Sequence, residues 1–373
     1  MKEYEMIVIG GGAAGLSAAI EAKRHGVNVL LIDSNDKAGG QLVKQTHKFF
    51  GAKMHRAGTR GFNICKELLK ESEDLGVEVL LNGLVMGIYD GDTVAVDVKV
   101  SLTEHKLMML KAKNIVISTG ASENAVRFEG WTLPGVMGAG AAQTMVNYRH
   151  VLPGKKMLMI GSGNVGLIVS YQLMQAGVEI KGIVEALPKI TGWQVHASKL
   201  TREGIHIYTG YTIKKAHGTD RVTGATIAKV NPDWSLVSGS EIEVDCDFIC
   251  IGAGLKPLTG LAHMAGCELI YDKALGGWAP AHNYNMETTK KGIYVAGDAT
   301  GLEEASTAIE EGTIAGAAIA EATGHLSAAE AEERKAGAWR RLADLRDGFH
   351  GEERLAAKNK QLAEYDRLMG VRE

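Results

Sequence analysis

The chain contains few cysteines, and none of them forms a reactive pair. Only four occur among 373 residues, Cys65, Cys246, Cys250 and Cys267, and none belongs to a CxxC motif. Dithiol redox chemistry within residues 66–245 is excluded, because it requires a thiolate nucleophile. The spacing also gives neither a disulfide framework nor a zinc site, so we expect no bound metal ion.

Long apolar runs and an excess of one charge are also missing. No stretch reaches the roughly 18 apolar residues that a membrane span requires, and no leader-like segment precedes the first apolar strand. The net charge of −3 gives no electrostatic reason to expect nucleic acid or an anionic membrane as a partner. We therefore expect a cytoplasmic protein without a membrane span that acts on a small-molecule substrate.

Glycine, in contrast, is abundant, with 47 residues, and some of it falls in a GxGxxG motif. The pattern predicts a strand over residues 4–9, a glycine loop, a helix over 16–25 and a second strand over 27–32 that ends at Asp33. The carboxylate lies roughly 20 residues after the first glycine, as in a dinucleotide-binding βαβ unit. The predicted loop residues are Gly10, Gly12, Ala14 and Gly15.

A second unit repeats this order of elements. The sequence predicts a strand over residues 156–160, a helix over 167–176 and a strand over 178–184 that ends at Glu185. In such a unit the pyrophosphate lies at the helix N-terminus, and the carboxylate accepts hydrogen bonds from the ribose. Two complete units predict two bound nucleotides. The second loop contains Gly161, Gly163, Asn164, Val165 and Gly166.

Two further turns bear on the identity of the first ligand. The GDAT segment at 297–300 follows a predicted strand and precedes a helix over about 303–322. Asp298, after Gly297, can bind the ribitol of a flavin, and the following helix can direct its positive end at the flavin ring. An STG segment, with Thr119 and Gly120, closes another strand ahead of a turn.

The order of these motifs resembles that of a known family. GGGAAG, Asp33, AGGQL, STGA, GSGNVG and YVAGDATG occur as in flavoproteins with two dinucleotide-binding domains, of which thioredoxin reductase is among the smallest. The segments FEGWTLPGVMGAGAAQ, CDFICIGAGLKP and LGGWAP are similar to the α subunits of opine oxidases, hydrogen cyanide synthase, dye-linked proline dehydrogenases and heteromeric sarcosine oxidase. The resemblance covers residues 4–322.

The resemblance implies an α/β fold with two Rossmann-like domains, the second inserted in the first. It implies an FAD-binding domain from residues 1–125 and 288–324 and an NAD(P)-binding domain from 126–287. A helical tail follows over 325–373. By the family's layout Gly40, Gln41 and Thr46 approach the flavin. Lys44 and His47 are candidates for proton transfer near it, with a structural or surface role as the alternative.

The choice of the second nucleotide rests on Glu185. A carboxylate at this position favours the free 2′-hydroxyl of NAD(H) over the 2′-phosphate of NADP(H), and no arginine cluster follows it. We expect NAD(H). The resemblance leaves two alternatives open, another adenine nucleotide or a purely structural role for this fold.

The tail predicts two amphipathic helices. Their apolar residues recur at helical spacings: Trp339, Leu342, Leu345, Phe349, Leu355, Leu362, Tyr365 and Leu368. The apolar stripe is expected either to cover the body or mediate self-association, or to dock a partner subunit. We expect the protein to form an oligomer. The related subunits often continue into an iron–sulfur module. No cysteine follows Cys267, so any such cluster would need another chain.

Three functions remain open on the sequence. The first is an FAD-dependent oxidoreductase that passes electrons between NAD(H) and bound FAD as a subunit of a multi-chain amine or amino-acid dehydrogenase, with a second flavoprotein or an iron–sulfur protein as partner. The second is a stand-alone NAD(P)H-dependent flavin reductase. The third is a nucleotide-holding scaffold. In the first, FAD supplies the redox chemistry and the protein supplies placement and electrostatics.

Overall fold

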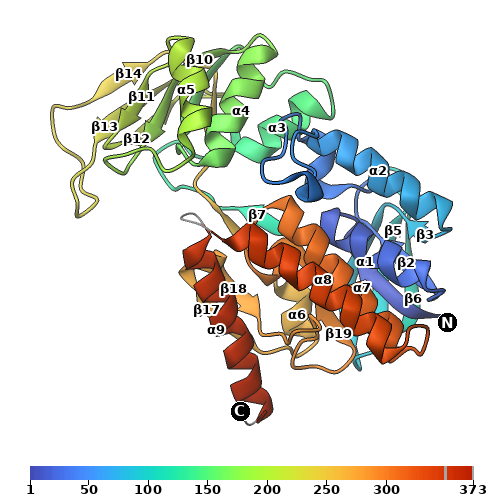
Figure 1. The fold of residues 1–373 in the computed structure, drawn as a ribbon. Helices are drawn as coiled ribbons and strands as arrows, with labels where there is room; N and C mark the ends of the chain where they lie inside the picture. Colours follow the sequence, from blue (N-terminus) through green and yellow to red (C-terminus); the bar gives the residue numbers. More distant parts are fainter. Residues whose placement is uncertain (348–350, 372–373) are drawn as a thin grey trace. The chain divides into compact units, whose positions relative to one another are not determined.

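The structure is a computed structural model that describes residues 1–347 and 351–371 (Figure 1). The chain forms two compact units, of which the first comprises Met1–Ser122 and Lys256–Glu373 and the second Glu123–Leu255. The second unit is thus inserted in the first. The chain returns to the first unit at Lys256, earlier than the predicted boundary after residue 287. The physical reason is packing, because Ala262 and Cys267 belong to the buried cluster of the first unit's sheet.

A seven-stranded sheet forms the centre of the first unit, in the order β3-β2-β1-β6-β5-β4, with β19 also paired to β6. Strands β1, β2, β3, β6 and β19 run parallel, whereas β4 and β5 are antiparallel to their neighbours. The bounds are β1 Lys2–Ile9, β2 Val29–Ile32, β3 Glu78–Leu80, β4 Gly83–Tyr89, β5 Thr93–Lys99, β6 His105–Ile117 and β19 Ile293–Val295.

Strand β6 is longer than the sequence predicts. The residue pattern indicates separate short strands near residues 107–110 and 114–120, and it indicates no strand at β4. The two short segments are one strand because residues 105–111 pair with β5 while residues 115–117 pair with β19. The carboxyl ends of β1 and β6 consequently lie side by side, paired through Ile9 and Ile117.

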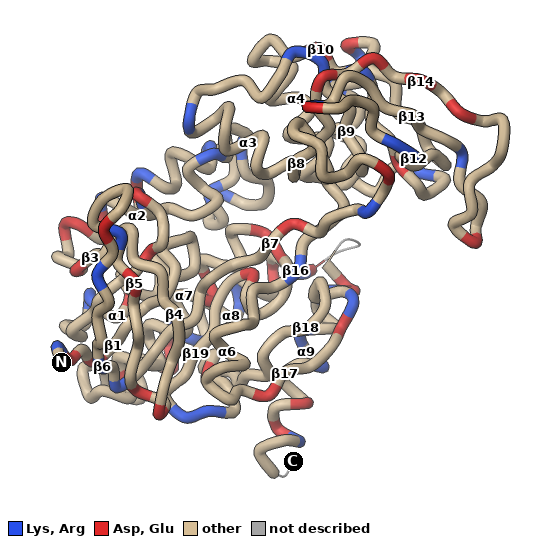
Figure 2. The backbone as a smooth tube through the Cα atoms, turned by 180° about the vertical axis from the view of Figure 1, so that it is seen from behind, with Lys and Arg blue, Asp and Glu red and all other residues tan. Residues whose placement is uncertain are grey.

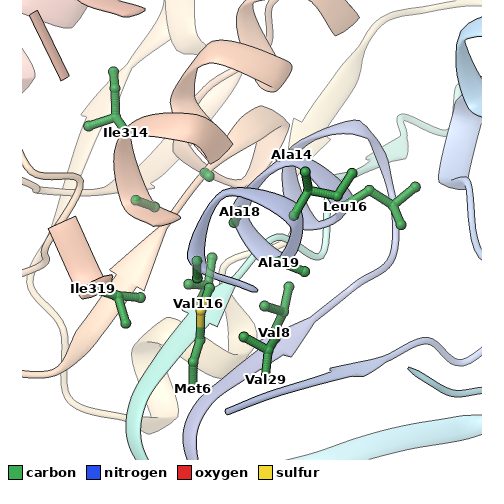
Figure 3. Packing of buried hydrophobic residues seen from close by; sticks show 14 of the residues in the cluster. Met6, Val8, Ala14, Leu16, Ala18, Ala19, Val29, Val116, Ile314 and Ile319 are labelled. Carbon is green, nitrogen blue, oxygen red and sulfur yellow. The ribbon is translucent and has the colours of Figure 1, made fainter. Parts of the chain in front are cut away.

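Helix α1 (Ala13–Arg24) packs between the sheet and helix α7 (Ala305–Ala322). Figure 3 shows Met6, Val8, Val29 and Val116 from the strands together with Ala18 of α1 in this cluster. The two helices approach closely, because a Cβ on Gly312 of α7 would overlap the carbonyl oxygen of Ala14. Close packing of α1 and α7 fixes the start of α1 relative to the turn that precedes α7.

The C-terminal tail forms two helices, α8 (Ala328–Arg346) and α9 (Glu352–Met369), as predicted. Leu342 of α8 is fully buried in the cluster that contains α1 and α7, and Ala357 and Tyr365 of α9 are buried in a cluster with residues 270–281. Phe349, which belongs to the predicted stripe, lies outside the described residues. The tail therefore buries apolar residues of both helices against the first unit, which favours the covering role.

The second unit contains a parallel sheet and an antiparallel one. The parallel order is β11-β10-β9-β15-β8, and the antiparallel order is β12-β13-β14. Helices α3, α4 and α5 connect the parallel strands. The bounds are β8 Val136–Gly138, α3 Ala139–Asn147, β9 Lys156–Ile160, α4 Asn164–Gln175, β10 Glu179–Glu185, α5 Gln194–Arg202, β11 Ile207–Thr209, β12 Tyr211–His217, β13 Gly224–Lys229, β14 Ile242–Val244 and β15 Phe248–Ile251.

Short elements complete the described chain. They are η1 Gly40–Lys44, η2 Lys53–His55, α2 Gly61–Asp74, β7 Ala121–Glu123, β16 Leu255–Pro257, α6 Gly260–Met264, β17 Leu269–Asp272, η3 Lys273–Leu275, β18 Gly277–Pro280 and η4 Gly297–Thr300. Basic and acidic residues are interspersed along both units (Figure 2). Within residues 1–347 and 351–371 no helix is long and apolar enough to cross a bilayer.

Candidate dinucleotide-binding sites

The first glycine loop joins β1 to α1 beside the end of β6. Gly10 N donates to Ile32 O at 2.8 Å, and Ser118 Oγ donates to Gly10 O at 2.9 Å. A Cβ on Gly15 would overlap Gly10 O, so only glycine allows the helix to start this close to the strand. The loop is therefore fixed at the junction of three elements.

Gly12 and Gly40 form a cradle without side chains in front of α1. Gly12 is the N-cap of α1 and contributes no capping side chain, and a Cβ on Gly40 would lie only 2.7 Å from Gly12 Cα. Gly39 N donates to Gly11 O at 2.6 Å, which holds the two backbone segments together. Uncapped amides at the positive end of a helix bind phosphate oxygens. The residues present therefore fit the pyrophosphate of a dinucleotide.

Asp33, at the end of β2, is buried and faces this loop. Its Oδ2 accepts a hydrogen bond from Gly11 N at 2.8 Å, and its Oδ1 accepts two from Asn35, each at 2.8 Å. A carboxylate accepts about four hydrogen bonds, so Oδ2 keeps capacity for one more donor. The predicted contact with a ribose hydroxyl is compatible with this geometry.

The Gly297–Thr300 turn lies against the start of α1. Gly297 adopts a positive φ of 72°, and a Cβ there would lie 2.9 Å from Ala14 Cβ. Asp298 is partly exposed, and its Oδ1 accepts a hydrogen bond from Glu303 N at 3.3 Å. Burial raises the pKa of Asp298 to about 6. A carboxylate beside the glycine loop is thus available to a hydroxyl donor. Its charged form destabilises the protein when no donor is bound to it.

The turn after β6 is tied to the segment after β16. Thr119 Oγ1 donates to Leu258 O at 3.0 Å, and Leu258 N donates to Gly120 O at 2.9 Å. Gly120 has a φ of 73°, which favours glycine. Leu258 was not identified from the sequence, because it lies far along the chain and matches no motif.

The remaining predicted flavin contacts lie between η1 and α2. Gln41 is exposed on η1, Lys44 is buried on the same element, and Thr46 O accepts a hydrogen bond from Arg60 Nη1 at 2.9 Å. His47 stacks with Phe49 at a ring separation of 6.2 Å. Their roles toward a flavin, including proton transfer by Lys44 and His47, stay predictions.

The second loop repeats the geometry of the first. Gly161 N donates to Val184 O at 2.7 Å, a Cβ on Gly166 would overlap Gly161 O, and Gly163 caps α4 without a side chain. Val165 is exposed beside Asn164, whose Oδ1 accepts a hydrogen bond from Trp193 N at 2.9 Å. The helix start again offers uncapped amides to an anion.

The repeat extends beyond the motifs found in the sequence. Gly192 N donates to Ser162 O at 2.9 Å, as Gly39 N donates to Gly11 O in the first unit. Gly252 N donates to Ile160 O at 2.6 Å, as Ser118 N donates to Ile9 O. A glycine close to the loop and a turn after the neighbouring parallel strand therefore occur in both units. The positions of Gly192 and Gly252 are visible in the sequence. Their hydrogen bonds to Ser162 and Ile160 could not be predicted, because the partners are distant along the chain.

Glu185 differs from Asp33 in how fully it is bound. Its Oε2 accepts hydrogen bonds from Ser162 N at 3.0 Å, Ser162 Oγ at 2.6 Å and Thr191 Oγ1 at 3.2 Å, and its Oε1 accepts one from Leu187 N at 2.9 Å. Three of these donors gather at Oε2, whereas Oε1 accepts one hydrogen bond and keeps capacity for another. A direct contact between Glu185 and a ribose hydroxyl stays a prediction.

The cysteines offer no reactive thiol. All four are free and buried. Burial raises the pKa of each thiol, to about 12 for Cys246. A thiolate is therefore disfavoured at neutral pH. Among the described residues no group of three or more His, Cys, Asp and Glu side chains could hold a metal ion.

A buried ion cluster behind the Gly297–Thr300 turn was missed by sequence reasoning. It joins Glu303 and Glu311 to Arg346 of α8 and Lys358 of α9, and the side chains are at most 5% exposed. Burial is the largest single effect on Glu311 and raises its pKa. Lys358, Arg346 and His282 together outweigh burial and hold the pKa below its usual range. No local pattern links these positions, so only the fold reveals the cluster.

Comparisons with known proteins match this geometry. The family model described as pyridine nucleotide-disulphide oxidoreductase covers residues 4–312. Hydrogen cyanide synthase subunit HcnB of Pseudomonas protegens is 27% identical over 91% of this chain and 75% of its own length. An opine oxidase subunit of Agrobacterium tumefaciens is 29% identical over 84% of this chain and 64% of its own length. Both relatives are longer than the part that this chain matches.

Solved structures share the fold. Thioredoxin reductase from T. acidophilum has a TM-score of 0.68 and 20% identity, with 87% of this chain and 99% of that chain covered. L-proline dehydrogenase from P. horikoshii has a TM-score of 0.67 and 23% identity, with 90% and 59% covered. At these identities the likeness establishes the fold alone, and it confirms the predicted pair of Rossmann-like domains.

Proposed function

Because the chain belongs to the pyridine nucleotide-disulphide oxidoreductase family and is an FAD-dependent oxidoreductase, we propose that it passes electrons between NAD(H) and bound FAD as one subunit of a cytoplasmic multi-chain amine or amino-acid dehydrogenase. The observation that carries this proposal is the presence of two complete glycine-loop sites, one in each unit. The relatives named above are themselves subunits, which supports a partner chain.

The first unit holds the FAD in this proposal. Gly12 and Gly40 would receive the pyrophosphate, Asp33 the adenosine ribose and Asp298 the ribitol. Bound FAD supplies an isoalloxazine ring that takes up and releases electrons. The protein positions the cofactor through the uncapped start of α1 and through a turn fixed against Ala14. Gln41, Thr46, Thr119 and Gly120 are further proposed contacts.

The second unit holds the nicotinamide nucleotide, with NAD(H) preferred. Glu185 is buried at the end of β10, and we attribute the preference to its negative charge. A 2′-phosphate at the ribose would meet the negative charge of this buried carboxylate, and the repulsion disfavours NADP(H). Asn164, Val165 and the Gly161–Gly166 loop would bind the pyrophosphate, which the start of α4 favours.

In this proposal electrons from the substrate reach the FAD of this chain through a partner, by a route other than a thiol, and pass on to NAD(H). The four cysteines are buried with raised pKa values, so a dithiol relay within this chain is disfavoured. A second flavoprotein or an iron–sulfur protein is therefore the proposed partner. The substrate, an amine or amino acid, would be oxidised on that partner or at its junction with this chain.

The experiment that tests the subunit role compares the isolated chain with its native complex. The complex is purified from the source cell through a tag on this chain and supplied with a panel of amines and amino acids. We expect substrate-dependent flavin reduction in the complex and not in the isolated chain. Steady turnover of an electron acceptor with NADH by the isolated chain alone, and no substrate oxidation by the complex, would instead identify a stand-alone reductase.

A further inference from the structure

Two side chains of helix α9 contact Thr300, at the end of the Gly297–Thr300 turn. We propose that Lys358 and Gln361 of α9 are positioning residues that hold this turn in the conformation that receives the flavin half of FAD. The inference rests on the proposed placement of FAD in the first unit. It assigns to the C-terminal tail a part in cofactor binding beyond covering the core.

Lys358 contacts the turn directly. Its Nζ donates to Thr300 Oγ1 at 2.6 Å and to Thr300 O at 3.2 Å, and it forms an ion pair with Glu311 Oε1 at 3.0 Å. Three acceptors match the three donors of an ammonium group. The side chain is 3% exposed, so an alternative contact with water is not available without opening the structure.

Gln361, one helical turn further along α9, adds a second contact. Its Nε2 donates to Thr300 O at 3.0 Å and to Pro280 O at 2.7 Å, and the residue is fully buried. Thr300 O therefore receives hydrogen bonds from two residues of the same helix. Side chains of α9 therefore bind both the backbone carbonyl and the side-chain hydroxyl of Thr300 at the end of the turn.

Glu311 connects these contacts to the beginning of the turn. Its Oε2 accepts hydrogen bonds from Gly297 N at 2.9 Å and Thr300 Oγ1 at 3.0 Å, while Oε1 faces Lys358 and Arg346. Arg346 in turn holds Glu303 through two hydrogen bonds. Two cations and two carboxylates balance, which is what buried charges require.

Burying these charges costs free energy on folding, and removing one of them from the folded protein is also destabilising. Replacing a buried ion pair by apolar residues is often neutral for stability, so stability alone does not account for the network. Removing one partner leaves an uncompensated charge. A shift of the turn would break the hydrogen bonds that Gly297 and Thr300 form with Glu311 and Lys358. Asp298, between Gly297 and Thr300, is thereby presented beside the start of α1 in one geometry.

This arrangement predicts a selective effect on binding. ADP resembles only the adenosine half of FAD and would use Asp33 and the Gly10–Gly15 loop, far along the sequence from the α9 contacts. FAD would also use Asp298. Loss of the α9 contacts should weaken FAD and spare ADP, whereas a general loss of folding would weaken both.

The test uses the full chain freed of flavin, with Lys358→Met as the variant and Lys360→Met as its matched control. Lys360 lies on the same helix, is exposed and pairs with Asp272 at 3.0 Å. FAD affinity is measured from quenching of flavin fluorescence, and ADP affinity from competition against FAD, which reports the first site alone. Thermal unfolding without FAD reports folding of each variant.

We expect Lys358→Met to weaken FAD about tenfold or more, as for loss of a hydrogen-bonded charge, with ADP changed less than about twofold. Lys360→Met should change neither. Gln361→Leu, which removes no charge, should weaken FAD about threefold. Should Lys358→Met fail to fold, the charge-balanced Lys358→Met/Glu311→Gln variant takes its place.

Equal weakening of FAD and ADP, or unchanged FAD affinity in folded Lys358 and Gln361 variants, would overturn the inference. Measuring FAD binding by the wild-type chain distinguishes failure of this inference from failure of the proposed function. Wild-type chain that binds no FAD refutes the placement of FAD itself, whereas normal binding by the wild type with unselective variants refutes only the role of α9.

Discussion

At the scale of single residues, Asp298 carries a conflict between stability and binding. Burial raises its pKa to about 6, from an ordinary value near 3.8. Glu311 adds to this effect, while the Glu303 amide and Lys358 oppose it. An acid whose pKa is raised by folding contributes less to the free energy of unfolding as pH rises from about 4 to about 6.

The first prediction follows from that sign. Without FAD, Asp298→Asn should unfold with a free energy about 3 kcal/mol higher than wild type at pH 8, and with a smaller advantage at pH 5, since one pKa unit corresponds to about 1.36 kcal/mol. Urea unfolding at both pH values measures this. The same variant should lose FAD affinity. An advantage that does not shrink at pH 5 would contradict the assigned cause.

The second prediction concerns the charge of Glu185. Glu185→Gln keeps the size of the side chain but removes its charge, so affinity for NADPH should rise relative to NADH by about tenfold, equivalent to roughly 1.4 kcal/mol of removed repulsion. Glu179→Gln, at the exposed end of the same strand, is the control. Titration of each nucleotide measures the ratio, and an unchanged ratio would remove Glu185 from cofactor choice.

Residue-level prediction succeeded where spacing is local. The loop glycines, Asp33 and Glu185 follow from short-range patterns, and the structure places each at the end of a strand or the start of a helix as expected. The additional hydrogen bonds that Ser162 Oγ and Thr191 Oγ1 donate to Glu185 were not foreseen, although Ser162 replaces Gly11 at the same loop position. Thr300 and Lys358 lie 58 residues apart, and no periodicity connects them.

At the scale of elements, the tail is the feature that the structure clarifies most. The sequence did not decide whether the tail covers the body or docks a partner subunit. An apolar stripe shows that a helix is buried, but it does not show which surface the helix is buried against. Leu342 packs beside α1 and α7 residues, and Tyr365 packs with residues 270–281. The packing of Tyr365 also keeps residues 270–281 in the first unit.

The third prediction tests that packing. Leu342→Ala should lower the free energy of unfolding by about 3 kcal/mol, as for other leucines removed from a packed core. Leu368→Ala, on α9 but 37% exposed, should change it by less than about 0.5 kcal/mol. Chemical denaturation of both variants is the measurement. Similar small effects for both would mean that α8 does not pack on the body as described.

At the scale of the whole molecule, the two units share the same arrangement of strands, glycine loop and carboxylate and differ in the hydrogen bonds of the carboxylate. Each has a set of parallel strands, a glycine loop closed by a backbone amide, and a carboxylate at the end of the neighbouring strand. Asp33 accepts hydrogen bonds from Gly11 and Asn35, whereas Glu185 accepts them from Ser162, Leu187 and Thr191.

The chain spans 75% of hydrogen cyanide synthase subunit HcnB and 59% of the L-proline dehydrogenase chain. The family and the fold class could be predicted from the order of the motifs. The second boundary between the units could not, because it depends on the packing of Ala262 and Cys267 against a sheet that is distant in sequence.

Anaerobic mixing of the purified, FAD-loaded chain with reduced nicotinamide nucleotides tests the central claim most directly. We predict that NADH bleaches the flavin absorbance, and that it does so faster than NADPH at equal concentration. A chain that binds no FAD on reconstitution, or a bound flavin that neither nucleotide bleaches, would contradict electron transfer between the two sites.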